Sequence, residues 1–174
     1  MKLESKRIAL CGLLCALALV VMLMGGIIPV ATFCAPVLAM VALLPVLAEF
    51  GARYAAAAYG AVSVLALLLV PDIETALVYV FFGWYPLLRP RIAALPSAPV
   101  RLVCRLAVCN GVVFLLYGVV ISLLGLTSVA EELGSGWFTL VLLVMANVVF
   151  LLLDRALGNL TRLWQRKLRR RFFR

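Results

Sequence analysis

Histidine is absent from this chain of 174 residues, and Asp and Glu together number only seven. Without histidine the chain has no Ser-His or Cys-His catalytic pair and no histidine-ligated metal site. A Gly-Lys-Ser/Thr sequence is also absent, so the chain has no P-loop with which to bind and split ATP. The five cysteines form no Cys-x-x-Cys pair, and Cys11 and Cys15 alone are too few ligands for a soft metal. We therefore expect no enzyme activity, no metal and no cofactor.

Charged residues of either sign are rare as well. They make up 13% of the chain, whereas hydrophobic residues make up 67% and the mean hydropathy is +1.20. A typical soluble domain is about 25% charged. The net charge of +9 would suit nucleic acid, but the basic residues stand at the ends of apolar runs, and we expect no nucleic-acid partner. The composition predicts an all-α integral membrane protein.

The segment from Pro71 to Arg91 predicts the direction in which the chain crosses the membrane. Asp72 and Glu74 precede an uncharged run over residues 75–88, and arginines follow that run. As a helix rising about 1.5 Å per residue, the segment crosses most of a bilayer core of about 30 Å. Positive charge is retained in the cytoplasm, so we expect the arginine end inside and the acidic end outside.

Five further apolar runs complete the predicted topology. The six predicted spans are 8–28, 30–48, 54–70, 75–88, 102–126 and 137–153. With both termini inside, all sixteen Lys and Arg fall on the inner side. Arg105, near the start of the fifth span, is expected to extend its side chain back to the interface, and Asp154 to mark the exit of the sixth. The sequence therefore predicts a six-span membrane domain over residues 1–155.

Residues 156–174 form a predicted second unit. Leu157, Leu160, Leu163 and Leu168 recur at helical spacing, and seven basic residues surround them. This pattern is typical of an amphipathic helix that lies on the anionic lipid of an inner leaflet. A solvated basic tail that only fixes the topology is the alternative.

Polar side chains within or beside the predicted spans form the candidate substrate site. Its members are Thr32, Glu74, Tyr79, Tyr117 and Asn147. Acidic and aromatic groups together suit a cationic or amine-bearing small molecule that arrives from outside. For Asn147, and for Asn110, the alternative is a hydrogen bond between two membrane helices.

Small residues form a stripe on the first predicted helix. Ala9, Gly12 and Ala16 share one helical face, and Gly12-x-x-x-Ala16 is a small-xxx-small pattern that lets another helix approach closely. The sequence leaves two possibilities open, which are packing within this chain and docking of another subunit.

Several features together resemble the substrate-binding S components of energy-coupling factor (ECF) vitamin transporters. They are the Lys6-Arg7-Ile8-Ala9-Leu10 opening before a small-residue helix, the second span with Pro36 and Pro45, and the third span rich in Ala and Gly. The length and the six-span topology with both ends inside also match. The resemblance covers essentially the whole chain, although no single motif in it is diagnostic.

This resemblance implies a subunit of the bacterial cytoplasmic membrane that captures a vitamin or similar micronutrient at its outer face. Such a subunit passes the ligand inward by docking on a separate membrane coupling protein that works with ATPases. In that family, small residues of the first helix face the coupling protein, and the matching positions here are Ala9, Gly12 and Ala16. The loop over residues 25–32 departs from the family because it is short and lacks polar residues that close over a ligand.

A structural role is the main competing hypothesis. The rod-shape-determining MreD proteins are also small, six-span and poor in charge, and they serve assembly rather than transport. A self-sufficient small transporter or channel is a further possibility.

Overall fold

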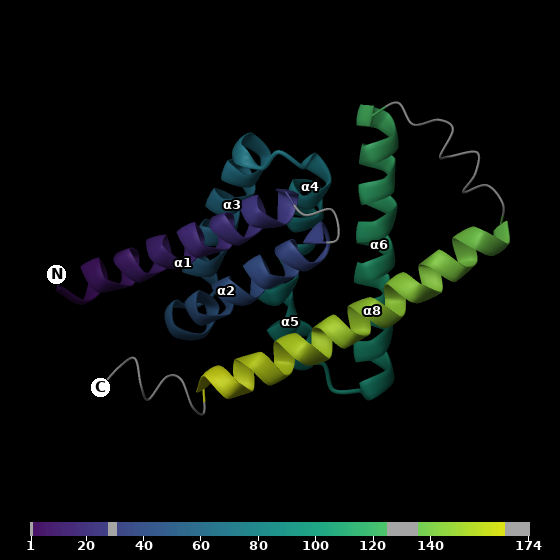
Figure 1. Ribbon diagram of the computed structural model, residues 1–174. Helices are drawn as coiled ribbons and strands as arrows, with labels where there is room; N and C mark the ends of the chain where they lie inside the picture. The colour runs from purple at the N-terminus through teal and green to yellow at the C-terminus, as the bar shows by residue number, and fades with distance from the viewer. Residues whose placement is uncertain (1, 28–30, 125–135, 166–174) are drawn as a thin grey trace. The chain divides into compact units, whose positions relative to one another are not determined.

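The computed structural model describes residues 2–27, 31–124 and 136–165, and its regular elements in these ranges are helical (Figure 1). The α-helices are α1 Lys2–Ile27, α2 Cys34–Phe50, α3 Ala52–Leu69, α4 Ile73–Phe82, α5 Tyr85–Ala93, α6 Ala98–Leu124 and α8 Gly136–Leu163. The prediction of an all-α protein is thus confirmed for the part of the chain that the structure describes.

Four of these helices contain an apolar segment long enough to cross a membrane. The segments are Ile8–Gly25 in α1, Ala52–Leu69 in α3, Ala98–Val119 in α6 and Thr139–Leu163 in α8. The helix α2 is also apolar but shorter, with 17 residues. Several long apolar helices in one chain indicate a multi-pass membrane protein.

The predicted fourth span is divided into two short helices. A turn at Gly83 and Trp84 separates α4, which has 10 residues, from α5, which has 9. At about 1.5 Å per residue, α4 alone is about 15 Å long and reaches only about half of a bilayer core. A Cβ atom at position 83 would lie 2.5 Å from the backbone oxygen of Tyr79 and 2.9 Å from Cε2 of Tyr59, so this turn has no room for a side chain. The uncharged run therefore does not correspond to one continuous helix.

The start of α4 agrees with the charge pattern of the sequence. Asp72 is the N-cap residue, and its Oδ1 accepts a hydrogen bond of 3.1 Å from the backbone N–H of Glu74. Its Oδ2 accepts a second bond, of 2.6 Å, from the hydroxyl of Thr75. A carboxylate in this position satisfies an otherwise unpaired N–H group and interacts favourably with the helix dipole.

The chain forms two compact units. Unit 1 comprises Met1–Leu88 together with Leu157–Arg174, and unit 2 comprises Arg89–Ala156. In unit 1, α1 and α2 pack along each other, and α3 and α4 complete the bundle (Figure 1). Small side chains fill much of its core, including Ala18, Ala39, Ala58 and Ala66.

Close approach of α1 and α2 depends on a glycine. A Cβ atom built on Gly25 would lie 2.1 Å from the Cβ of Ala35, a separation at which no side chain is accommodated. The backbone of α1 therefore lies directly against the methyl group of Ala35 at this point, which is the kind of contact that small residues permit between membrane helices.

The helix α8 does not end where the sixth predicted span ends. It continues past Leu153 and Asp154 to Leu163, and Leu157 in this extension is completely buried. Within unit 1, Nε1 of Trp164 lies 3.2 Å from Oε1 of Glu49, which ties the end of this extension to the end of α2. The predicted surface helix over 156–174 thus begins as a continuation of α8, and residues 166–174 lie outside the described part of the chain.

Candidate functional site

Three of the five predicted substrate residues belong to unit 1. The Thr32 carbonyl oxygen lies 3.4 Å from the hydroxyl of Thr75, so the loop before α2 meets the first turn of α4. The side chain of Glu74 is exposed next to this contact. Tyr79 is completely buried in the core, and its ring centroid lies 5.8 Å from that of Tyr59. Its hydroxyl has no hydrogen-bond partner among the described residues.

The other two predicted residues belong to unit 2. Tyr117 on α6 is 41% exposed. On α8, Nδ2 of Asn147 donates to Oδ1 of Asn110 at 2.8 Å and also to the carbonyl of Leu143. The structure thus shows the interhelical hydrogen bond that the sequence left open for Asn110 and Asn147. The five residues are divided between the two units, and their joint cavity stays a prediction.

A small hollow lies within unit 1 but does not have the size of a vitamin site. It is lined by apolar side chains of α2 and α3, by Tyr59, and by the turn at Gly83, and its volume is about 10 Å³. That space suits about one water molecule. Pockets for small-molecule ligands are about 300–1,000 Å³. The hollow is therefore not a substrate cavity.

The predicted docking stripe lies on an exposed face of α1. Ala9, Gly12 and Ala16 are all exposed, and a Cβ atom added at Gly12 would meet no other atom within 4 Å. The opposite face of the same helix carries Ala18 and Met22, which are fully buried against the rest of unit 1. The structure describes a helix that packs with one face and leaves the small-residue face open.

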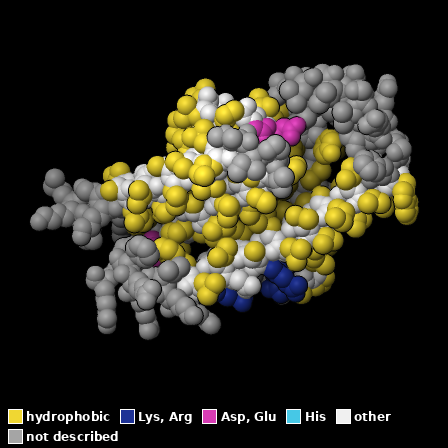
Figure 2. All heavy atoms as spheres, in the orientation of Figure 1, with side chains coloured by type: hydrophobic (Ala, Val, Ile, Leu, Met, Phe, Trp, Pro, Cys, Tyr) yellow, Lys and Arg dark blue, Asp and Glu magenta, His cyan; other side chains and the backbone are white. Residues whose placement is uncertain are grey.

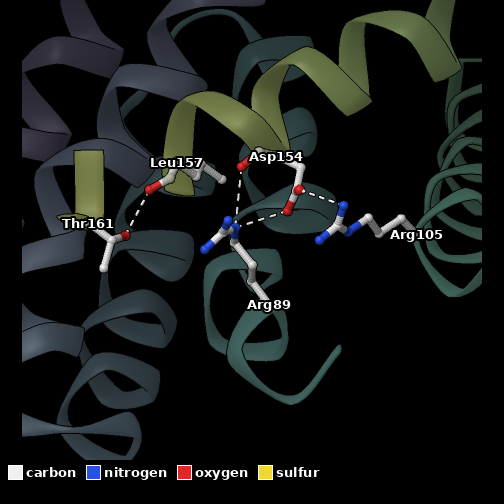
Figure 3. A network of polar contacts seen from close by, with 5 residues as sticks. All are labelled: Arg89, Arg105, Asp154, Leu157 and Thr161. Atoms are coloured by element: carbon white, nitrogen blue, oxygen red, sulfur yellow. Dashed lines mark hydrogen bonds and ion pairs between the residues drawn. The ribbon is translucent and has the colours of Figure 1, made fainter. Parts of the chain in front are cut away.

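A charged network in unit 2 was not found by sequence reasoning (Figure 3). Asp154 on α8 is only 2% exposed, and arginines from two other helices converge on its carboxylate. Nε of Arg89, on α5, lies 2.9 Å from Oδ1 and 3.3 Å from the backbone oxygen of Asp154. Nη1 of Arg105, on α6, lies 3.2 Å from Oδ2. In Figure 3 the two guanidinium groups approach the carboxylate from opposite sides.

The network changes the interpretation of two residues. We expected Arg105 to extend toward the interface and Asp154 to mark the end of a span, each acting separately. The structure instead pairs them directly. The available sequence signal was that Arg89, Arg105 and Asp154 each stand near the end of an apolar run. Charges in such positions need partners, because an unpaired buried charge is costly.

The described residues contain no group of three or more Cys, Asp or Glu side chains that would hold a metal ion. Comparison with protein-family models, with curated proteins and with solved structures gives no match for this chain.

Proposed function

We propose that this chain is an S-component-like subunit of an ECF-type micronutrient transporter in the bacterial cytoplasmic membrane. In this proposal the chain crosses the membrane six times with both termini inside. It receives a vitamin-like small molecule from outside, at the residue set Thr32, Glu74, Tyr79, Tyr117 and Asn147. A separate membrane coupling protein with its ATPases supplies the energy, since the sequence has no P-loop of its own.

The exposed small-residue face of α1 is the observation that carries the proposal. Membrane helices gain little from hydrophobic burial against each other, so association depends on close van der Waals contact. Ala9, Gly12 and Ala16 offer a flat surface for such contact, and the space in front of Gly12 is open. The buried face of the same helix already supplies the packing that unit 1 needs. An outward docking role accounts for both faces.

Anionic lipid is the second partner in this proposal, and it would contact the basic end of the chain. Residues 156–174 would contact anionic lipid of the inner leaflet through their basic side chains. This contact would hold the subunit at a fixed depth while the ligand site alternates between the two sides of the membrane.

A scaffolding role of the MreD type uses the same exposed stripe with a different partner. The two functions are separated by gentle purification from native membranes, followed by native mass spectrometry and identification of the retained proteins. The transport proposal predicts a coupling membrane protein with ATPases, and a small-molecule adduct on the free subunit. Envelope-assembly proteins without either companion would contradict transport and favour the scaffold.

A further inference from the structure

The cluster of Arg89, Arg105 and Asp154 in unit 2 holds more positive charge than its carboxylate neutralises. Two guanidinium groups face one carboxylate, which gives the cluster a net charge of +1. The Asp154 side chain is 3% exposed, whereas those of Arg89 and Arg105 are 22% and 24% exposed. The cationic part of the cluster therefore reaches the surface of unit 2, and the anionic part is enclosed.

The hydrogen bonding of the two arginines is also incomplete. Each guanidinium has five N–H donors. Arg89 uses its Nε for Asp154, and Arg105 uses one terminal nitrogen for the other carboxylate oxygen. Nε of Arg105 is buried and has no acceptor among the described residues. Phosphate has several acceptor oxygens, and its geometry matches that of guanidinium donors in bidentate contacts.

The position of the cluster favours a phosphate that belongs to a lipid. Arg89 directly follows the uncharged run 75–88, Asp154 directly follows the apolar run 137–153, and Arg105 lies near the start of the apolar part of α6. Charged side chains beside uncharged membrane segments cost least where they reach the level of the lipid headgroups. Basic pockets between membrane helices at this level bind anionic headgroups.

The surrounding charge of unit 2 has the same sign. Its described residues include the exposed Arg91 and Arg155, and Asp154 is the acidic residue among them. On the face drawn in Figure 2 hydrophobic side chains predominate. An anion near the cluster would thus be attracted by several cations and repelled by one enclosed carboxylate.

We propose that Arg89 and Arg105 bind the phosphate group of an anionic phospholipid at the membrane–water interface. Asp154 is a positioning residue in this site, because its carboxylate holds one guanidinium group on each side and offsets their repulsion. The site is separate from the basic end of the chain, and it does not depend on whether the protein is a transporter or a scaffold.

The decisive test compares the full-length protein in nanodiscs of phosphatidylcholine alone and of phosphatidylcholine with phosphatidylglycerol. Asp154→Asn raises the charge of the cluster from +1 to +2, so this variant should lose thermal stability in the neutral lipid and recover most of it in the anionic lipid. Arg105→Gln should reduce the stabilisation by phosphatidylglycerol that the unmodified protein shows. A purely structural ion pair predicts that each variant loses the same stability in both lipids, and that result would overturn the proposal.

Arg155→Gln is the matched control, because it removes one exposed positive charge beside Asp154 without touching the cluster. It should keep the phosphatidylglycerol effect. Equal loss in Arg155→Gln and Arg105→Gln would mean that only general surface charge is involved, and would refute a specific site. Arg105→Lys gives a second variant if Arg105→Gln does not fold. It retains the charge but not the planar donors, and it should also weaken the effect.

The source of the phosphate is tested in the same system. Inorganic phosphate added to the protein in phosphatidylcholine should not reproduce the shift in melting temperature, and a shift that needs Arg105 would overturn the assignment to lipid. Native mass spectrometry should also find phosphatidylglycerol retained on the unmodified protein. Retention should fall about fivefold in Arg105→Gln, as expected for one basic residue at an anionic surface.

Discussion

Nδ2 of Asn147 donates a hydrogen bond to Oδ1 of Asn110 at 2.8 Å, and so joins α8 to α6 within unit 2. In the sequence, Asn110 and Asn147 each stand within an uncharged, mostly apolar stretch, and the structure shows that these two amides meet. Between membrane helices such a bond contributes about 1 kcal/mol.

A double-mutant cycle tests this pair. Asn110→Leu and Asn147→Leu should each lower the free energy of unfolding, and the double variant should lose less than the sum of the two. The expected coupling energy is about 1 kcal/mol, measured by reversible unfolding in detergent micelles. Additive losses would show that the two amides act independently. Asn147 would then have no structural role through Asn110, and its proposed role in ligand binding would stand by itself.

The contact between α1 and α2 gives a second prediction. Gly25→Ala places a methyl group against Ala35, where only 2.1 Å is available between the two Cβ atoms. Overpacking of this kind costs about 1–3 kcal/mol, and the melting temperature should fall accordingly. Gly111→Ala is the control, because a Cβ atom at Gly111 meets nothing within 4 Å. A melting temperature that falls equally in both variants would contradict the close helix contact.

The topology gives a third prediction. In a variant without the five natural cysteines, single cysteines placed at residues 127–135 should react with an impermeant thiol reagent on intact cells. Cysteines placed at residues 92–99 should be protected until the membrane is permeabilised, because arginines flank that segment and are retained inside. The opposite pattern of labelling would exclude six spans with both ends inside.

The sequence predicts the helical class well because composition and long apolar runs alone determine it. It does not predict the turn at Gly83 and Trp84, since hydropathy treats Gly83 as one more uncharged residue. The need for glycine at position 83 becomes evident only when the ring of Tyr59 is seen to occupy the space that a side chain there would need. A local pattern cannot show a contact between helices that are far apart in sequence.

The charged network was missed for the same reason. The sequence places Arg89, Arg105 and Asp154 each near the end of an uncharged run. Their pairing depends on how α5, α6 and α8 meet, and no spacing in the sequence specifies that arrangement. For Asn110 and Asn147 the sequence did predict an interhelical hydrogen bond as one alternative, because polar groups in membrane helices commonly bond to each other.

The central claim is that the exposed face of α1 docks a coupling subunit, and Gly12→Leu tests it most directly. Gly111→Leu is the matched control, because Gly111 is also an exposed glycine in a long apolar helix with open space at its Cβ. The measurement is the yield of copurified partner at matched expression, taken together with the melting temperature of the isolated protein. We predict that Gly12→Leu loses the partner and keeps its melting temperature, while Gly111→Leu retains both. A Gly12→Leu protein that keeps its partner, or that loses it only because its own melting temperature falls, would contradict docking at this face.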